Sequence, residues 1–424
     1  NKTRLRGRPT DTRHESLRLD DTPLSASQGV IDVRYGRAGA MPDRYSERSA
    51  DVLIVGAGIA GLSLAIALSK SDCQVVVIDG ADCPKSVNEG VALNDWDLRV
   101  SALTPTSIRF LESLGVWQRI PSERTAPYHA MCVWDADGTG RITFNAEDVA
   151  APCLGHIVEN RQTVQALIEC AEACSGVELR WQSALESLSR TPDGWSIDCA
   201  GDQRLSAQLV VAADGARSKV RQLTAQPTRD WDYHQSAIVG TVALSSPHQA
   251  TCWQAFLSSG PLALLPLPDP DKVALVWSLD EEEHAEVAAL SDTAFIQALN
   301  HALGPLAPHA EAVGTRVSFP LKQSHAIDYV DDALVLVADA AHSIHPLAGQ
   351  GINLGLSDVR ILAQELLAGR AGGLTVSSPV SLKRYQRQRK SENLAMMAAM
   401  EGFKRGFGSP HPAAVILRNI GLNM

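Results

Sequence analysis

The feature that most constrains this chain is an uncharged run, residues 52–69, that contains three glycines. Its length reaches about the 18 residues expected of a candidate membrane-spanning helix. The run opens with VLIV, however, and β-branched residues favour a strand, whereas glycines weaken a helix. We therefore predict three short elements around a glycine turn: a strand over 51–55, a helix over 59–69 and a strand over 75–78.

The glycines of this turn, Gly56, Gly58 and Gly61, stand in the pattern Gly-x-Gly-x-x-Gly, and Asp79 ends the second predicted strand. Glycines at this spacing let backbone amides approach a pyrophosphate at a helix N-terminus. A carboxylate after the second strand can accept hydrogen bonds from ribose hydroxyls. Because both strands and the acid are present, we predict a dinucleotide site rather than tight packing alone. These residues leave NAD and FAD open.

Composition excludes several classes of protein. The 424 residues are too many for one core and predict two or three domain-sized units. A net charge of −10 without a basic, aromatic-rich stripe excludes a nucleic-acid partner. The eight cysteines are irregularly spaced and show no zinc-binding pattern, which favours a reducing compartment. His342 and His345 beside Asp339 lack further ligands, so we predict no metal site.

The rest of the chain alternates between short strands and longer helical stretches. Turn signals separate short β-rich segments, which predict a meander over 177–181, 184–189, 195–199 and 205–211. Further β-rich runs over 237–244, 262–267 and 273–278 predict a second, sheet-based unit. A buried strand over 334–337 and a helix from 353 to about 367 then complete the first unit.

A second motif, LVLVADAAHSIHPLAGQGINLGLSD, covers residues 334–358. It reads as a buried strand, an aspartate at the end of that strand, a glycine-containing loop and a helix. The carboxylate of Asp339 can hold a polyol chain, and the positive helix end near 349–353 can stabilise a reduced, anionic flavin. The alternative is an ordinary strand, loop and helix. The motif favours FAD over NAD.

These residues resemble a known family. The segment 338–358 resembles the ribityl-binding motif of the single-component flavin aromatic hydroxylases, and VVAADGARS at 210–218 resembles their Asp-Gly motif. The resemblance runs from about Asp51 to the C-terminus. Further segments are similar to the ubiquinone-biosynthesis hydroxylases of the UbiH/UbiF/VisC type: LRVSAL at 98–103, GHIVEN at 155–160, WDYHQ at 231–235 and residues 261–268. The stretch 128–144 is closest to the 2-octaprenylphenol hydroxylase (VisC-like) type.

The resemblance implies cofactor-binding roles for individual residues. Gly56, Gly58, Gly61 and Asp79 would hold the ADP half of FAD, Arg99 would meet the pyrophosphate, and Asn160 would touch the cofactor. Asp214 would contact FAD and NAD(P)H. Asp339 would bind the ribityl chain, with Gly349, Gln350, Gly351 and Asn353 at the flavin ring. No side chain is expected to act as a catalytic group, because the flavin carries the chemistry.

The same resemblance implies an α/β fold, in which an FAD-binding Rossmann-like domain of the aromatic hydroxylase type carries an inserted mixed β-sheet substrate domain. The expected boundaries are a flexible extension over 1–49, a discontinuous FAD-binding domain over 50–125, 155–228 and 326–424, and a substrate domain over 126–154 and 229–325. We also expect a biological start near Met41 and a C-terminal segment that continues beyond Met424.

Two local features qualify the resemblance. The family has Gly-Asp where this chain has Ala338-Asp339, and a Cβ at a positive φ would cost on the order of 1 kcal/mol and loosen FAD. The basic run RYQRQRK at 384–390 is interpreted as a solvated helix face. The alternative is that this run, with the apolar stretch after it, touches anionic lipid or a partner.

The implied activity is hydroxylation of a polyprenylphenol ring in ubiquinone biosynthesis, with C5 as the favoured position. NAD(P)H would reduce FAD, and O₂ would then form a flavin hydroperoxide that transfers oxygen to the ring. The expected partners are the lipophilic substrate, O₂, and other ubiquinone-biosynthesis proteins or the membrane surface. The expected location is the cytoplasm, or peripherally at the inner membrane. Two alternatives stay open: another flavoprotein oxidase or prenyl reductase on the same fold, and a non-catalytic FAD-binding subunit.

Overall fold

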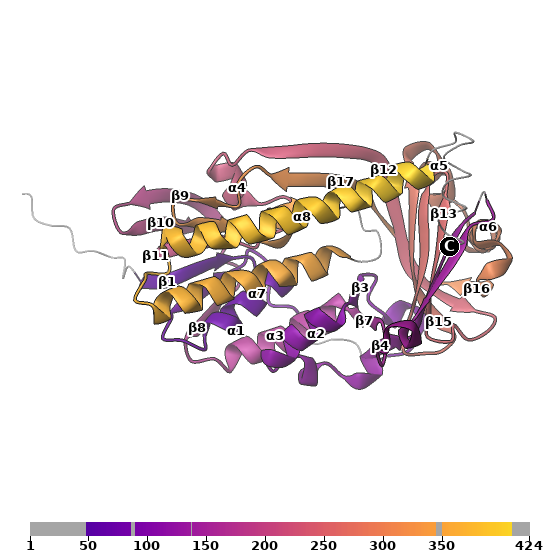
Figure 1. Cartoon of the computed structure of the whole chain (residues 1–424), viewed down its shortest axis with the longest axis horizontal. Coiled ribbons are helices and arrows are strands. Elements are labelled where there is room, and N and C mark those ends of the chain that lie inside the picture. The colour runs from indigo at the N-terminus through magenta and orange to yellow at the C-terminus, as the bar shows by residue number, and fades with distance from the viewer. Residues whose placement is uncertain (1–47, 86–89, 137, 345–349, 409–424) are drawn as a thin grey trace, which may run out of the picture. The chain divides into compact units, whose positions relative to one another are not determined.

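The computed structural model describes residues 48–408 except 86–89, 137 and 345–349 (Figure 1). All of these residues belong to one compact unit. Most of the predicted extension over 1–49 therefore lies outside the described residues, as does the predicted start at Met41. Its last two residues are not an extension, because the first strand already begins at Arg48.

A mainly parallel sheet forms the first layer. Its strands follow the order β18-β19-β11-β1-β2-β8, and β10 and β9 extend it from β11. The bounds are β1 (Arg48–Val55), β2 (Val75–Ile78), β8 (Val177–Arg180), β9 (Leu185–Thr191), β10 (Gly194–Cys199), β11 (Gln203–Ala212), β18 (Val330–Asp331) and β19 (Leu334–Leu336). Every residue of β2 is buried, as expected for a parallel strand covered on both faces.

The uncharged run at 52–69 is confirmed as strand, turn and helix. Its helix, α1 (Ile59–Leu68), follows β1 and leads into β2, which lies parallel to β1. None of the described helices is both long enough and apolar enough to cross a membrane. The predicted meander is confirmed for its last three segments, because β9, β10 and β11 pair antiparallel in sequence and β11 then joins β1 in parallel. Its first segment, 177–181, is not part of the meander: it forms β8, which pairs in parallel with β2.

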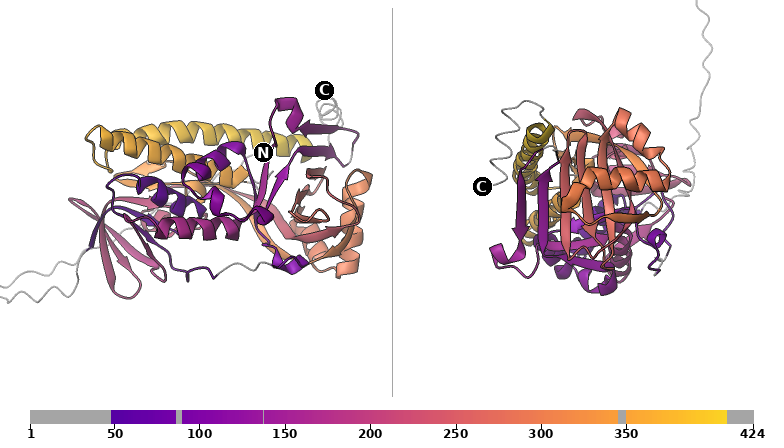
Figure 2. Two further views of the ribbon diagram at one scale, coloured as in Figure 1. Left: turned by 90° about the horizontal axis from the view of Figure 1, so that it is seen from below. Right: turned by 90° about the vertical axis from the view of Figure 1, so that its right-hand side faces the viewer.

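Helices pack against both large sheets. The remaining helices are α2 (Pro105–Ser113), α3 (Asn160–Glu172), α4 (Lys219–Leu223), α5 (Glu281–Ala288), α6 (Asp292–Leu303), α7 (Gln350–Ala371) and α8 (Pro379–Gly408). Of these, α3, α4 and α8 contact strands of the parallel sheet, whereas α5 and α6 pack on the second large sheet. α7 packs against α1 and against α8, and α7 and α8 lie side by side in Figure 1. α8 contacts both β18 of the parallel sheet and β13 (Thr251–Leu257) of a second sheet. The left view of Figure 2 shows α8, in yellow, lying along α7, in orange.

The second large sheet is mixed, with the order β20-β17-β12-β15-β14-β13-β5-β6 and β16 paired to β12. Its strands are β5 (Ala130–Asp135), β6 (Arg141–Asn145), β12 (Thr228–Leu244), β13 (Thr251–Leu257), β14 (Gly260–Pro266), β15 (Lys272–Asp280), β16 (Ala310–Val313), β17 (Val317–Ala326) and β20 (His342–Ser343). A small third sheet joins β3 (Val100–Leu103), β7 (Gly155–Glu159) and β4 (Thr125–Tyr128).

The α/β class and the inserted mixed sheet agree with the expectation from sequence. The two predicted insertions meet in one sheet, because β5 from the first pairs with β13 from the second. The expected domain boundaries remain a prediction, since residues 45–424 form one compact unit and β17 also pairs with β20.

Candidate functional site

Four predicted motifs meet at one edge of the parallel sheet. Strands β1, β2, β11 and β19 are mutually parallel neighbours, and their last residues are in register: Val55 lies opposite Ile78 and Ala212, and Ala212 lies opposite Leu336. The residues that follow these strand ends include Gly56, Asp79, Asp214 and Asp339. In open α/β sheets ligands bind at the carboxyl ends of the strands. Segments far apart in the sequence therefore converge on one ligand-binding edge.

The glycine turn is built by close backbone approach. Gly56 has φ +106°, and a Cβ there would lie 2.4 Å from the carbonyl oxygen of Ala213. A Cβ on Gly61 would lie 2.0 Å from the carbonyl oxygen of Gly56. Gly58 is different, because a Cβ there would meet no protein atom within 4 Å. The fold thus requires Gly56 and Gly61, whereas Gly58 faces space left for a ligand.

Asp79 holds the same turn from the side. Its Oδ2 accepts a hydrogen bond from the amide of Ala57 at 2.8 Å, and its Oδ1 accepts one from Ala81 at 2.9 Å. No side chain caps α1, which begins just after Gly58 and has no acidic residue in its first turn. Free N–H groups at a helix N-terminus attract an anion such as a phosphate. The remaining lone pairs of the Asp79 carboxylate can accept hydrogen bonds from sugar hydroxyls.

A cavity of about 560 Å³ opens at this edge. Of the predicted residues, Gly58, Arg99, Asn160, Asp339 and Gly351 line it. Gly56, Gly61, Asp79, Asp214 and Asn353 do not line it, although both neighbours of Asp214 do. A second hollow of about 420 Å³, between α1, α2 and α7, contains none of the predicted residues.

The segment that carries Arg99 is fixed by a buried acid. Glu159 accepts hydrogen bonds from the amide of Asp97 at 2.6 Å and from Nε of Arg124 at 2.7 Å. Asn160 donates its backbone amide to the carbonyl of Arg99 at 2.9 Å, and its side-chain oxygen accepts from Ser101 at 2.6 Å. Arg99 itself is exposed at the cavity. The site thus presents an exposed cation on a segment that hydrogen bonds hold in place.

Asp339 points into the cavity from a strained turn. The preceding Ala338 has φ 52°, so the positive φ considered from the sequence is present and carries a Cβ. Asp339 is exposed at the cavity. The atoms packed around its carboxylate desolvate it and raise the pKa of Asp339, while the positive charges of His342 and Arg99 oppose the rise. The carboxylate can accept hydrogen bonds from the hydroxyls of a ligand.

Asp214 offers a further unsatisfied acceptor. Its Oδ2 accepts from the amide of Val220 at 3.1 Å, and its Oδ1 is buried without a partner among the described residues. Buried polar atoms are rarely left unpaired. The predicted contact of Asp214 with a ligand stays a prediction, because Asp214 itself does not line the cavity.

The predicted flavin-ring residues divide into three groups. Gly351 lines the cavity at the start of α7. Asn353 instead bonds to protein: its Oδ1 accepts from the amide of Thr104 at 3.0 Å and its Nδ2 donates to Ala102 at 2.8 Å. Gly349 lies outside the described residues, and Gln350 is described only as the first residue of α7. The predicted roles of all four remain predictions.

Two buried acids, Glu159 and Asp358, are not among the predicted site residues. Both lie within segments that resemble the family, GHIVEN at 155–160 and 334–358, so the sequence does carry a signal for them. The interpretation of 384–390 as a solvated face is wrong in part, because Tyr385 and Arg389 are buried. The cause is the packing of α8 along α7, which turns one face of this basic run inward.

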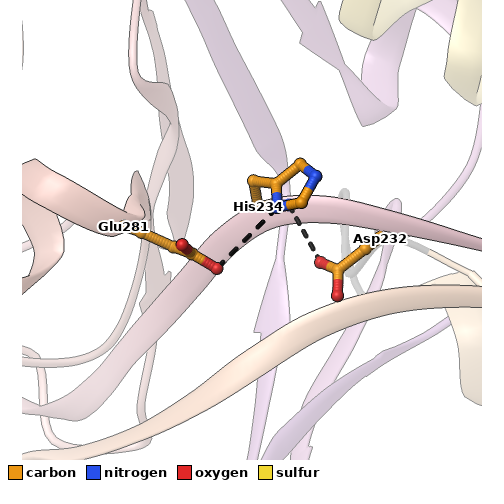
Figure 3. A group of neighbouring side chains, drawn as sticks. All are labelled: Asp232, His234 and Glu281. Atoms are coloured by element: carbon orange, nitrogen blue, oxygen red, sulfur yellow. Dashed lines mark hydrogen bonds and ion pairs between the residues drawn. The ribbon is translucent and has the colours of Figure 1, made fainter.

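Asp232, His234 and Glu281 form a group of potential metal ligands on the surface (Figure 3). All three are exposed, and Lys322 pairs with Asp232 at 3.2 Å. His234 lies where the pairing of β12 with β17 shifts register. A cation already compensates this group, so we assign no metal to it.

Taken together, the edge of the sheet fits a ligand with phosphates and hydroxyls, and one wall of its cavity is apolar. The space at Gly58 and the uncapped α1 suit phosphates, while Asp79 and Asp339 suit sugar and polyol hydroxyls. The opposite wall of the cavity is apolar, formed by Val239, Ala263, Leu265, Val276, Phe319 and Leu321 of the mixed sheet.

Comparison with known proteins gives consistent results. The family described as FAD binding domain matches residues 49–399. The 3-demethoxyubiquinol 3-hydroxylase of Escherichia coli is 36% identical over 88% of this chain and 93% of its own length. The ubiquinone biosynthesis monooxygenase COQ6 of Xenopus tropicalis is 33% identical over 95% of each chain. The p-nitrophenol 4-monooxygenase PnpA of Pseudomonas putida, 19% identical, shares the fold with a TM-score of 0.70 over 89% of this chain and 94% of its own.

Proposed function

Because the chain belongs to the FAD binding domain family and is an FAD-dependent monooxygenase that uses NAD(P)H, we propose that it hydroxylates a polyprenylphenol ring in ubiquinone biosynthesis. The favoured position is C5 of the ring. The proposed partners are a lipophilic substrate and O₂, with other ubiquinone-biosynthesis proteins or the membrane surface as further candidates. The proposed location is the cytoplasm or the periphery of the inner membrane.

The observation that carries this proposal is the two-sided cavity. One side consists of strand-end motifs suited to FAD, and the other is an apolar wall from β12, β14, β15 and β17. An aromatic ring with a hydrocarbon chain matches that wall, because burying apolar surface is favourable by about 25 cal/mol per Å². A small, charged phenol would gain little from it.

The proposed mechanism assigns binding and orientation to the protein. When bound, FAD supplies the redox chemistry and the activation of O₂. Gly58 and the N-terminus of α1 would hold its phosphates, Asp79 the ribose, and Asp339 the ribityl hydroxyls. The N-terminus of α7, at Gly351, would stabilise negative charge on the flavin ring.

The apolar wall would orient the phenol and exclude water from the reacting centre. No side chain is required as a nucleophile in this scheme. The protein's contribution is positioning and electrostatics, which agrees with a cavity whose lining, among the described residues, has three titratable side chains: Asp339, Arg99 and Lys322.

The test is an isotope experiment with the purified, FAD-loaded protein. It is incubated with NAD(P)H, ¹⁸O₂ and a short-chain prenylphenol, and the product is analysed by mass spectrometry and NMR. We expect one ¹⁸O atom on the ring, at C5. Substrate oxidation without ¹⁸O in the product would overturn the proposal and favour an oxidase or reductase.

A second candidate substrate follows from the relative in Escherichia coli, whose name specifies hydroxylation of 3-demethoxyubiquinol. The same assay with a demethoxylated quinol in direct competition with the prenylphenol separates the two. The substrate with the larger kcat/KM identifies the step.

A further inference from the structure

A buried polar cluster lies behind the cavity and plays no part in the mechanism proposed above. It comprises Tyr329, His342, Asp358, Arg389 and Asn393, here named the Asp358 cluster. Each of these residues is at most 1% exposed. Asp358 belongs to α7, and Arg389 and Asn393 belong to α8.

The carboxylate of Asp358 has donors at both oxygens. Its Oδ1 accepts from Nε of Arg389 at 2.7 Å and from Nδ2 of Asn393 at 3.1 Å. Its Oδ2 accepts from Nε2 of His342 at 2.5 Å. Burial raises the pKa of Asp358, but the charges and hydrogen bonds of His342 and Arg389 outweigh burial and leave the pKa below its usual value. Asp358 is therefore a buried carboxylate.

The fourth donor to Asp358 links the cluster to the cofactor site. The backbone amide of Ala338 donates to Oδ2 of Asp358 at 2.9 Å. Ala338 is the residue with φ 52°, and the next residue, Asp339, points into the cavity. Ala338 is also enclosed by α7, because a Cβ on Gly355 would lie 2.8 Å from the Cβ of Ala338. The left-handed turn thus packs against α7, and the Asp358 carboxylate of α7 accepts its backbone amide.

A buried ion pair seldom adds net stability compared with apolar residues of the same shape. Such a pair can instead fix one geometry among several. The turn at Ala338 has a strained backbone that other conformations would relieve. The Asp358 carboxylate accepts hydrogen bonds from four donors, and one of these is the backbone amide of Ala338. This hydrogen bond can hold the strained backbone in its observed conformation.

We propose that Asp358, held by Arg389 and Asn393 of α8, is a positioning residue for the cofactor. It fixes the left-handed turn at Ala338 so that Asp339 faces FAD, and it makes FAD affinity depend on the packing of α8 against α7. This inference rests on the proposed contact between Asp339 and the cofactor. Asp358 touches neither FAD nor substrate and acts through Asp339.

The test compares FAD affinity among matched variants of the full chain. Apoprotein is titrated with FAD, and the dissociation constant is read from the change in flavin fluorescence and in the visible spectrum of bound flavin. Asp358→Asn removes the charge, and Arg389→Lys keeps the charge but loses the planar guanidinium. We expect both variants to bind FAD at least about tenfold more weakly, a difference of about 1.4 kcal/mol.

The control variant is Trp195→Phe. It removes a buried hydrogen bond of 3.0 Å to the carbonyl of Ala333, at the opposite end of β19 from Ala338. It should lower the unfolding free energy of the apoprotein without changing the FAD dissociation constant. If Asp358→Asn does not fold, Arg389→Lys carries the test. An unchanged FAD affinity in Arg389→Lys, or a change no larger than in Trp195→Phe, overturns the inference.

A double-mutant cycle separates this inference from the assignment of Asp339. Asp339→Ala should weaken FAD binding, and adding Arg389→Lys to it should weaken binding no further, because both act through one contact. Additive effects would overturn the positioning role while leaving Asp339 as a cofactor residue. If Asp339→Ala alone leaves FAD affinity unchanged, the site assignment and the inference both fail.

Discussion

At the scale of the residue, the same glycine motif contains two different physical requirements. Gly56 and Gly61 are glycines because the backbone of a neighbouring segment occupies the place of a Cβ. Gly58 is a glycine beside empty space. The pattern Gly-x-Gly-x-x-Gly cannot separate these roles, because both produce the same letter in the sequence.

This difference predicts opposite outcomes for two alanine variants. Gly58→Ala should leave the unfolding free energy of the apoprotein within about 0.5 kcal/mol, yet weaken FAD binding by at least about tenfold because its Cβ enters the phosphate space. Gly61→Ala should destabilise the apoprotein itself. Denaturant unfolding and FAD titration measure the two effects. Equal loss of apoprotein stability in both variants would contradict the prediction.

Ala338 gives a second prediction at this scale. It holds φ 52°, a region where a Cβ costs on the order of 1 kcal/mol. Ala338→Gly should therefore raise the free energy of unfolding by up to about 1 kcal/mol and keep or tighten FAD binding. Urea unfolding of the apoprotein at one pH measures the change. A loss of stability would show that the turn relaxes without strain in this chain.

At the level of secondary-structure elements, one buried acid, Glu159, fixes a segment that borders the cavity. Glu159 ends β7 and is 1% exposed, and its oxygens bind Arg124 at 2.7 and 3.0 Å. Arg124 also lies over the ring of Trp96. These contacts hold the segment with Asp97 and Arg99 against the start of α3.

Glu159→Gln should thus destabilise the protein by about 3 kcal/mol, because it leaves the buried guanidinium of Arg124 without a counter-charge. Glu178→Gln is the matched control, since its ion pair with Arg180 at 2.9 Å is partly exposed and should cost less than about 1 kcal/mol. Denaturant unfolding compares the two. Similar losses would mean that Arg124 finds another partner.

At the scale of the whole molecule, a buried histidine should control stability in mild acid. His325 of β17 is 3% exposed and contacts the hydroxyl of Tyr329 at 3.0 Å. Desolvation, with the charge of His342 adding to it, lowers the pKa of His325 to about 4. The unfolded chain takes up this proton near pH 6.5, and the folded protein does not take it up until about pH 4.

The free energy of unfolding should therefore fall by roughly 2–3 kcal/mol as the pH is lowered from 7 to 4.5. This contribution is fully present above the unfolded pKa and is lost as the pH approaches the folded pKa. His325→Gln should remove most of the pH dependence in this window. Urea unfolding at several pH values measures both proteins, and parallel curves would rule out His325 as the cause.

The mixed sheet supplies the last prediction, because it forms the apolar wall of the cavity. Ala263→Phe on β14 would fill space opposite the FAD edge. The rate of prenylphenol hydroxylation should fall at least about tenfold, which corresponds to about 1.4 kcal/mol. The FAD dissociation constant should stay within about twofold of that of the parent protein. Steady-state kinetics and FAD titration provide the two readings. Weaker FAD binding in this variant would place the cofactor against β14.

The sequence by itself determined the local units: β1, the glycine turn, α1 and β2 were all predictable because turn and strand preferences act over a few residues. It also identified the motif residues after each strand, through their resemblance to the flavin hydroxylases.

Tertiary packing determines which of these residues lie close together. Asp358 gathers donors from Ala338, His342 and Arg389, and no local pattern fixes such a meeting. The same is true of the basic run in α8, where packing against α7 buries Arg389 and leaves Arg387 exposed. Burial depends on which residues lie opposite in space. The order of residues along the chain does not show which distant residues these are.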